Sequence, residues 1–560
     1  MKCSVIPSAR LLVDHLMANG IKDIVISPGS RSAPLVLSFT TNPFFRCYSI
    51  VDERCAAFFA LGMSQNQGKP VALVCTSGSA VLNYYPGISE AYYSTIPLIA
   101  ISADRPPYKI DIGDGQTIRQ TGVFSHHVGY AANLKIDVSH AQNTIQAFAP
   151  ELLLASQETV QHYNAKEIEQ ALTTALEKSL PVHINIPFEE PLYGVVDLEE
   201  NNKVSPVIVN NQQGTQNLLE QFMPVWKKAK RKMILVGVNK PDKAQQHFLE
   251  ILANDPSVLV FTETTSNLHH PHFFPSIDSI IFPIEKSKHK EDRFQELQPD
   301  LLLTFGGLIV SKKVKAFLRK YKPKHHWHVD KTRATDTFFS LSHHFKLDID
   351  YFLAQLTQDY QNTTSSYFEH WHAVKNKYEV QRNAFLETIP FSDFLVFEKV
   401  QGSIPKNYQL HLSNSSTVRY AQLFDCEASL SVFCNRGTSG IDGSVSTAIG
   451  ASIYHHTPTL LITGDLSFFY DSNGLWNKYI RNDFRIVLLN NAGGGIFRIL
   501  PGKEDSDGFQ TFFETTHQMT AAKLCEQYGF EYSQVHNSAT LEVALNSFYK
   551  KGSQPKLLEV

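Results

Sequence analysis

The sequence predicts an α/β protein built from three doubly wound parallel-sheet domains. Short apolar runs of strand length alternate with longer segments of helical periodicity along most of the 560 residues. This alternation is typical of a parallel sheet that is covered by helices on both faces. It lapses in the polar stretches 192–212 and 359–382. Because one hydrophobic core stops growing at about 250–300 residues, we expect separate domains at 1–192, 210–350 and 380–560.

The first domain opens with a helix that we expect to be capped by Ser8 and to stop at Gly20. A second helix is predicted over 53–67, where apolar residues recur at helical spacing before Gly68. The apolar runs between the helical segments predict strands at 24–27, 47–51, 71–76, 98–103 and 182–186.

The same pattern continues in the other two domains. In the second domain, strands are predicted at 233–238, 257–262, 301–305 and 326–329. In the third, they are predicted at 408–412, 430–434, 459–463, 485–490 and 556–560. A polar helical region over 359–382 leads from one to the other.

Composition narrows the class of protein. The chain is 43% hydrophobic and 19% charged, with a net charge of -3, which favours a folded protein and gives no electrostatic reason to bind nucleic acid. No run approaches the roughly 20 apolar residues of a membrane span, so we expect no membrane insertion. The seven cysteines are scattered without a CxxC pair, which favours reduced thiols and a cytoplasmic location.

Two strand ends in the third domain carry residues suited to a divalent cation. Gly464 and Asp465 follow one predicted strand, and Asn491 and Gly493 follow the next. The carboxyl ends of neighbouring parallel strands share one edge of a sheet, where ligands bind. Mg²⁺ prefers about six oxygen ligands. We therefore predict a metal site formed by the Asp465 carboxylate, the Asn491 amide oxygen and the Gly493 carbonyl, with phosphate oxygens and water. A helix starting near Asp471 is expected to offer N–H groups to phosphate.

Glu53 is the second candidate. It follows a predicted strand and opens a helix, where an acidic residue is favoured by the helix dipole without any further function. In an apolar pocket, however, a carboxyl group has a raised pKa and can act as an acid or a base. Its sequence context alone leaves both interpretations open.

The arrangement of Gly464 and Asp465 with Asn490 and Asn491 resembles the diphosphate and metal signature of the thiamine diphosphate-dependent enzymes, although Leu466 stands where that signature usually has Gly. In this family, a glutamate placed like Glu53 hydrogen-bonds the pyrimidine ring of the cofactor. The resemblance therefore implies thiamine diphosphate and Mg²⁺, with Mn²⁺ as an alternative metal.

Several strings are similar to one branch of this family, the synthase branch of menaquinone biosynthesis. They are SPGSRSAP at 27–34, TSGSA at 76–80, ADRPP at 103–107, QTIRQ at 116–120, NRGTSGIDG at 435–443 and GDLS at 464–467. In this branch Leu466 is typical. The resemblance implies a transferase that decarboxylates 2-oxoglutarate and adds the succinyl carbanion equivalent to isochorismate in a 1,4 sense.

Both substrates are anions, so their pocket requires cationic groups. The positions that match the substrate-binding residues of the family are Ser30, Arg31, Arg105, Gln116, Lys312, Ser415, Arg419 and Arg436. Of these, the resemblance assigns catalytic roles to Arg31, Arg105, Gln116, Arg419 and Arg436, beside Glu53. Lys313 is nearly as good a candidate as Lys312, and Gly115 stands where some relatives have a polar side chain.

The cofactor-binding set implied by the resemblance is Glu53, Ser415, Ile441, Gly464, Asp465, Leu466, Asn491 and Gly493. Ile441 is the candidate for the bulky residue under the bent cofactor. The family also implies a homodimer, or a dimer of dimers, with active sites between subunits. Two alternatives are another thiamine diphosphate-dependent 2-oxo acid decarboxylase or carboligase, and a non-catalytic binding protein on the same scaffold.

Overall fold

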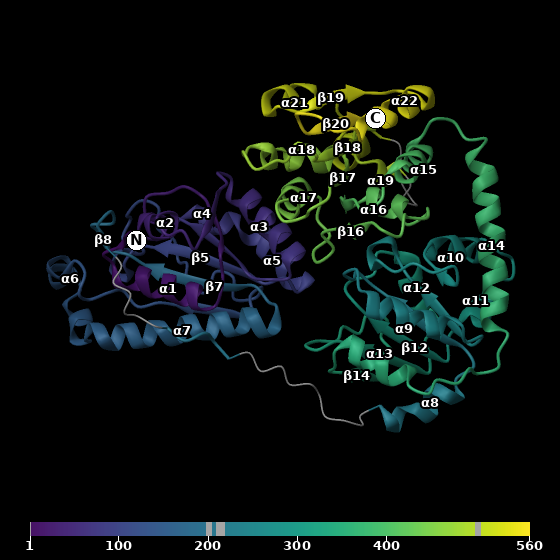
Figure 1. The fold of residues 1–560 in the computed structure, drawn as a ribbon, viewed down its shortest axis with the longest axis horizontal. Helices are drawn as coiled ribbons and strands as arrows, with labels where there is room; N and C mark the ends of the chain where they lie inside the picture. The colour runs from purple at the N-terminus through teal and green to yellow at the C-terminus, as the bar shows by residue number, and fades with distance from the viewer. Residues whose placement is uncertain (1, 198–203, 209–218, 499–505) are drawn as a thin grey trace.

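The computed structural model describes residues 2–197, 204–208, 219–498 and 506–560. Within them the predicted fold class is confirmed: three six-stranded parallel sheets are flanked by helices, and a small antiparallel pair joins β1 (Lys2–Ser4) to β8 (Val195–Asp197). Figure 1 shows the first domain at the left, the second at the lower right and the third at the top.

The first sheet has the strand order β3-β2-β4-β5-β7-β6. Its strands are β2 (Asp23–Ile26), β3 (Arg46–Ser49), β4 (Val71–Cys75), β5 (Leu98–Asp104), β6 (Tyr130–Asn133) and β7 (Val182–Pro187). The helices are α1 (Pro7–Ala18), α2 (Ala33–Thr40), α3 (Glu53–Gln67), α4 (Ser79–Asn83), α5 (Tyr85–Ser94), α6 (Gln142–Phe148) and α7 (Gln157–Lys178). The expected cap at Ser8 is wrong, because Ser8 lies inside α1 and Ile6 occupies the N-cap.

The second sheet has the order β11-β10-β9-β12-β13-β14. Its strands are β9 (Lys232–Val236), β10 (Val258–Phe261), β11 (Phe273–Phe274), β12 (Leu301–Phe305), β13 (His325–Val329) and β14 (His343–Phe345). The helices are α8 (Met223–Lys228), α9 (Lys243–Ala253), α10 (Ile277–Glu285), α11 (Lys290–Leu297), α12 (Lys312–Lys320) and α13 (Ile349–Thr357). The long helix α14 (Tyr367–Leu386) then leads to the third domain.

The third sheet has the order β16-β15-β17-β18-β20-β19. Its strands are β15 (Gln409–Leu412), β16 (Ser431–Phe433), β17 (Thr459–Gly464), β18 (Arg485–Leu489), β19 (Glu531–Gln534) and β20 (Lys556–Glu559). The helices are α15 (Asp393–Ser403), α16 (Ser416–Ala421), α17 (Ser444–Ser452), α18 (Asp465–Tyr470), α19 (Gly495–Arg498), α20 (Asp507–Phe509), α21 (Ala522–Tyr528) and α22 (Ser538–Phe548).

The first and third sheets have the same topology. Numbered within each domain, both run 2-1-3-4-6-5, whereas the middle sheet runs 3-2-1-4-5-6. The doubly wound layout therefore recurs in two versions. Each version reverses strand order near its centre, and such a reversal is where ligands bind in open parallel sheets.

The first and third domains share a hydrophobic core. Ala56, Phe59 and Ala60 of α3 are buried in one cluster with Ala448 and Ile449 of α17. The two helices pack so closely that a Cβ added at Gly62 would lie 2.0 Å from the Thr447 carbonyl oxygen. In α17, a Cβ added at Gly450 would lie 2.0 Å from the Phe59 carbonyl oxygen, so both helices depend on glycine at their contact.

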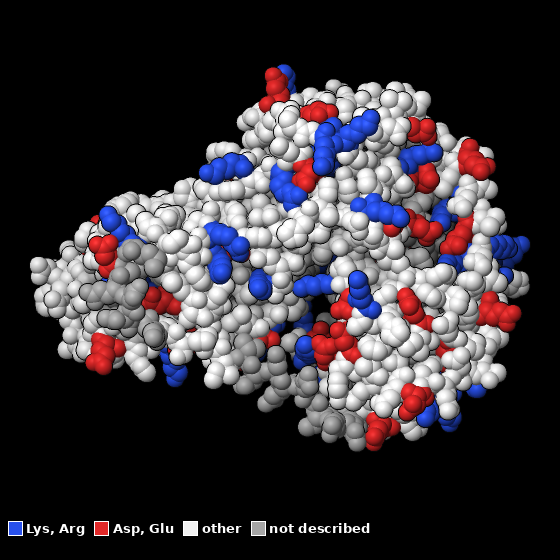
Figure 2. Space-filling model, viewed as in Figure 1, with Lys and Arg blue, Asp and Glu red and all other residues white. Residues whose placement is uncertain are grey.

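The surface carries both signs of charge. Figure 2 shows Lys and Arg interspersed with Asp and Glu over this face, together with a hollow between the first domain and the middle domain. None of the helices in the described ranges is both long and apolar enough to cross a bilayer.

Candidate active site

The metal and diphosphate candidates line one cavity of about 190 Å³ in the third domain. Of the eight residues predicted to bind cofactor, all but Glu53 are at its wall: Ser415, Ile441, Gly464, Asp465, Leu466, Asn491 and Gly493. Every described residue that lines the cavity lies between 393 and 497. Parallel pairing of β15, β17 and β18 brings the carboxyl ends of these strands together, so the sheet itself assembles the site.

Asp465 lines this cavity. Its carboxylate is buried and accepts hydrogen bonds from the backbone N–H groups of Leu466 at 2.7 Å and Gly493 at 2.8 Å. Burial raises the pKa of this carboxyl group, and the two backbone donors oppose the shift. His517 Nε2 lies 3.2 Å from the same carboxylate. The sequence motifs did not reveal His517, which lies far along the chain from the β17 end.

Asn491 has the free oxygen that a metal ligand requires. Its amide nitrogen donates to Asp393 at 2.8 Å, whereas its Oδ1 is buried without a hydrogen-bond partner among the described residues. An unpaired buried oxygen is costly unless a ligand satisfies it. One carboxylate, one free amide oxygen and a nearby main-chain carbonyl are a donor set that suits Mg²⁺, so these residues fit the metal that the sequence implies.

The backbone around the cavity is tightly constrained. Gly493 has φ 145°, and a Cβ there would lie 2.7 Å from the Glu514 carbonyl oxygen. Ser415 precedes α16 with φ 70°, a conformation that non-glycine residues rarely adopt. The expected helix near Asp471 is wrong: α18 begins at Asp465, and a short 3-10 turn, η5 (Ser472–Leu475), follows it. N–H groups of the first turn of α18 are therefore closer to the site than those of η5.

Glu53 lies outside this cavity, in the first domain. It starts α3 directly after Asp52, whose side chain caps the helix by accepting from the Cys55 N–H. Burial raises the pKa of the Glu53 carboxyl group, and a hydrogen bond with Asn83 opposes this shift. Glu53 is thus a half-buried carboxyl group whose pKa is shifted upward by burial, in the direction that favours proton exchange.

The other first-domain candidates gather at the carboxyl edge of the first sheet. Arg31 is 3% exposed, donates to the Phe188 carbonyl and forms a 3.0 Å ion pair with Glu190. Burial lowers the pKa of Arg31, and nearby Arg105 adds to this effect. Arg105 donates to the Gly115 carbonyl at 2.9 Å, so Gly115 makes a main-chain contact next to Gln116. Ser30 and Gln116 themselves are exposed.

Arg436 is held from two sides. Its Nη1 donates to Asn414 Oδ1 at 2.7 Å, and the Asn414 amide also donates to two carbonyls of the same loop. Glu90 of the first domain accepts from the N–H groups of Gly437 and Thr438, both at 2.7 Å. Sequence reasoning missed Asn414 and Glu90, because their partners are distant in the chain.

The lysine candidates of the middle domain stand apart. Lys312 is exposed at the start of α12, and Lys313 is paired with Glu285. Lys315 is partly buried, and its pKa is lowered by burial and by the nearby charges of Arg436 and Arg419. Lys315 is therefore a further cation of α12 near these arginines, and it was not among the predicted residues.

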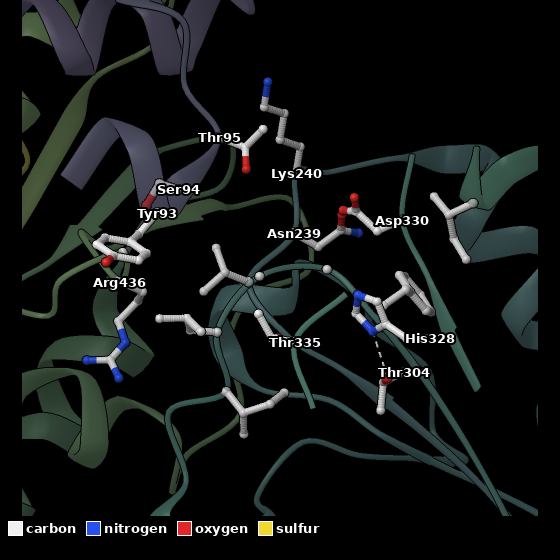
Figure 3. A pocket seen from close by; sticks show the side chains of 18 of the residues that line it. Tyr93, Ser94, Thr95, Asn239, Lys240, Thr304, His328, Asp330, Thr335 and Arg436 are labelled. Atoms are coloured by element: carbon white, nitrogen blue, oxygen red, sulfur yellow. Dashed lines mark hydrogen bonds between the residues drawn. The ribbon is translucent and has the colours of Figure 1, made fainter. Parts of the chain in front are cut away.

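A larger cavity of about 490 Å³ lies between the first and middle domains and reaches the third. Figure 3 shows Tyr93, Lys240 and Asp330 around it, with Arg436 at one end pointing away from Asp330. Of the predicted site residues, only Arg436 lines it. It is therefore distinct from the cavity of Asp465.

This fold and site correspond to a known class. Residues 8–127 match the N-terminal TPP binding domain of the thiamine pyrophosphate enzymes, residues 201–412 match their middle domain, and residues 414–560 match their C-terminal TPP binding domain. The matches define a thiamine pyrophosphate enzyme, and thiamine pyrophosphate is another name for thiamine diphosphate.

Proteins named 2-succinyl-5-enolpyruvyl-6-hydroxy-3-cyclohexene-1-carboxylate synthase are similar over almost the whole chain. The protein from Christiangramia forsetii is 52% identical over 100% of this chain and 96% of its own length. Those from Flavobacterium johnsoniae and Flavobacterium psychrophilum are 49% and 51% identical, over 99% and 96% of this chain and 95% and 92% of their own lengths. The chain belongs to this synthase family.

The predicted resemblance, the enzyme class and the thiamine diphosphate cofactor are thus confirmed. The chain is a thiamine diphosphate-dependent transferase, and its substrates are small molecules. The alternative of a different decarboxylase or carboligase is not supported.

Proposed function

We propose that the chain decarboxylates 2-oxoglutarate and adds the remaining succinyl unit to isochorismate in a 1,4 sense, with uptake of a proton and release of CO₂. The product would be the 2-succinyl-5-enolpyruvyl-6-hydroxy-3-cyclohexene-1-carboxylate of menaquinone biosynthesis for which its relatives are named. The observation that carries the proposal is the cavity in which separate strand ends bring Asp465, Asn491 and Ile441 together.

In this proposal the third domain binds the charged half of the cofactor. Asp465, Asn491 and Gly493 would hold Mg²⁺ or Mn²⁺, and Gly464 and Ser415 would lie along the diphosphate. Ile441 is 37% exposed at the cavity wall, so it and Leu466 would offer apolar contact to the cofactor there. When bound, thiamine diphosphate supplies the carbon nucleophile that makes loss of CO₂ from a 2-oxo acid feasible.

Glu53 would hold a proton beside the nitrogen of the cofactor's pyrimidine ring. Its carboxyl group lies among Asn83, Tyr84 and Cys75, and burial favours the protonated form. A group of this kind can both donate and receive the proton as the ring changes tautomer. We assign Glu53 the acid and base role at this atom.

Arginines would bind the substrate carboxylates. A guanidinium group presents a planar fork that matches a carboxylate, and it gains strength where water is excluded. We assign this role to Arg31, Arg105, Arg419 and Arg436, together with Ser30, Ser415, Gln116 and Lys312. Arg31 and Arg436 are both buried, so each would be shielded from bulk water.

The proposal includes a homodimer or a dimer of dimers. No first-domain residue lines the Asp465 cavity among the described residues, and Glu53 lies outside it. A second copy of the chain would bring its Glu53 to the cavity. We also propose domain limits of 1–192, 210–350 and 380–560. All seven cysteines are unpaired, which supports a cytoplasmic location.

A mixing assay tests the reaction. With thiamine diphosphate and Mg²⁺ present, 2-oxoglutarate alone should release CO₂ slowly, and isochorismate should accelerate the release. Pyruvate should not replace 2-oxoglutarate, because it lacks the second carboxylate. Equal turnover of pyruvate would contradict the proposed substrate.

A further inference from the structure

A buried polar segment of the middle domain contacts the helix that carries Arg419 and the strand that precedes Arg436. This segment, residues 263–267, follows β10 and includes the 3-10 turn η4 (Thr264–Ser266). All five of its side chains are polar and buried, with exposures of 0–7%. Burying polar groups is unfavourable unless they form hydrogen bonds. Of these five side chains, Thr265 alone lacks a hydrogen-bond partner among the described residues.

Two contacts join the segment to the third domain. Thr264 Oγ1 donates to the Ala421 carbonyl at 3.1 Å, at the end of the helix that carries Arg419. Asn267 Oδ1 accepts from the Val432 N–H at 2.7 Å, and its amide donates to the Val432 carbonyl at 2.9 Å. Val432 lies in β16, which leads to Arg436. The segment is therefore hydrogen-bonded to α16, which carries Arg419, and to β16, which precedes Arg436.

Glu263 makes the third connection. Its carboxylate accepts from the Val310 N–H at 2.8 Å and from the Ser311 N–H at 2.8 Å. The Val310 carbonyl in turn accepts from Arg419 Nη1 at 3.5 Å. Val310 therefore links the two charged groups: its N–H donates to the Glu263 carboxylate, and its carbonyl accepts from the Arg419 guanidinium.

The charges around Glu263 are mostly positive. Arg436, Arg419 and Lys315 all interact electrostatically with it, and Asp278 of α10 is the acidic group in the same neighbourhood. Burial lowers the pKa of Arg419 and of Lys315, and the nearby charge of Arg436 lowers both further. Both effects disfavour the charged forms of these side chains. A buried carboxylate in their midst offsets this repulsion.

We propose that segment 263–267 positions Arg419 and Arg436. Glu263 fixes the backbone of Val310 and Ser311, and the Val310 carbonyl accepts from Arg419. In this way Glu263 determines how tightly the anionic substrates bind. Glu263 is a positioning residue, since it acts through Val310 and Ser311. The inference rests on the proposed function, in which both arginines bind substrate carboxylates.

The variant Glu263→Gln tests this role in the full chain with thiamine diphosphate and Mg²⁺. Gln keeps the size of the side chain but loses its charge and one acceptor. We expect the KM for 2-oxoglutarate or for isochorismate to rise about tenfold, equivalent to about 1.4 kcal/mol, while kcat falls less than about threefold. Cofactor affinity should not change.

Asp255→Asn is the matched control. Asp255 is a fully buried carboxylate at the other end of β10, where it accepts from Ser257 and pairs with Lys232 at 3.6 Å. The Asp255→Asn variant should have a lower thermal midpoint than the wild type, while both KM values stay unchanged. If Glu263→Gln behaves like this control, the segment is only structural and the inference fails.

The pH profile gives a second measurement. Burial raises the pKa of Glu263 to about 7, against the effect of its backbone donors and Arg436. Below this pH the carboxyl group takes up a proton and no longer offsets the charges of Arg436, Arg419 and Lys315. Asp278, whose own pKa is raised by burial, is the acidic group beside it. A protonated carboxyl group also accepts more weakly from the Val310 and Ser311 N–H groups that fix the backbone beside Arg419. The wild-type KM should therefore rise as pH falls from 8 to 6, and Glu263→Gln should lack this rise.

Thr264→Val decides the question if Glu263→Gln does not fold. It removes one hydroxyl with little change in shape, and we expect a KM increase of about threefold to fivefold; an unchanged KM would overturn the inference. A wild-type enzyme that fails to use 2-oxoglutarate and isochorismate would instead contradict the proposed function. An active wild type with unchanged KM in both variants would contradict the inference alone.

Discussion

Single residues decide the chemistry, and they differ in how visible they are in the sequence. Asp465 and Asn491 could be predicted, because both follow apolar runs that become neighbouring strands. Glu90, Asn414 and His517 could not, because each acts through a contact that only the folded chain creates. No regular spacing of residues in the sequence predicts such a contact.

Glu53→Gln should keep cofactor binding and lose most turnover. Gln cannot exchange a proton with the ring nitrogen, and general acid–base groups contribute about 10²–10⁴-fold to rate. The measurement is kcat beside calorimetric titration with thiamine diphosphate. Asp52→Asn is the control, since Asn can still accept from the Cys55 N–H, and its kcat should stay near that of the wild type. Full activity of Glu53→Gln would rule out the assigned role.

Asp465→Ala should abolish metal-dependent cofactor affinity. The change removes the only carboxylate of the predicted ligand set and also the acceptor of the Gly493 N–H. Titration with thiamine diphosphate, with Mg²⁺ and with a chelator, measures the effect. Removing the metal from the wild type should produce a similar loss, and the exposed Asp292→Ala should produce none. If Asp465→Ala still responds to Mg²⁺, another residue holds the metal.

At the scale of elements, burial separates what could be predicted from what could not. The central strands were predicted because both faces are buried, which produces continuous apolar runs such as β4 and β12. The edge strands β6, β11, β14 and β19 were missed. They are two to four residues long, and β6 and β19 are largely exposed or half-buried, so their sequences lack that apolar signal.

The contact between α3 and α17 can be tested by filling its space. In Gly62→Ala the new Cβ would lie 2.0 Å from the Thr447 carbonyl and 2.7 Å from the Ala451 nitrogen. Such overpacking typically costs about 1–3 kcal/mol, so the thermal midpoint should fall.

Gly402→Ala is the matched control for Gly62→Ala. Gly402 is exposed in α15, and no atom of the described residues lies within 4 Å of the position of a Cβ there. Ala at this position should stabilise the protein by about 0.5–1 kcal/mol. Equal midpoints for the two variants would show that the helix contact is looser than described.

For the whole molecule, buried histidines make stability depend on pH. Burial lowers the pKa of His183 and of His411 to about 3, whereas an unfolded histidine has a pKa near about 6.5. Below pH 6.5 the unfolded chain takes up protons that the folded chain does not. Folding stability should therefore fall by up to about 1.4 kcal/mol per pH unit for each histidine, until pH approaches the folded pKa.

Urea unfolding at pH 7.5 and pH 5 measures this effect. The midpoint should be lower at pH 5, and His183→Asn should reduce the difference between the two pH values. His162→Asn, at an exposed position of α7, should leave the difference as in the wild type. A midpoint that rises on acidification would contradict the assignment.

The core that α3 shares with α17 also has a consequence for synthesis on the ribosome. Ala60 and Ile449 belong to one apolar cluster, so the first domain is translated long before the residues that complete its core. At about 5–20 residues per second, this delay is roughly 20–80 seconds. During that interval the nascent chain presents an uncovered apolar helix face to the cell, and its folding cannot finish until translation is nearly complete.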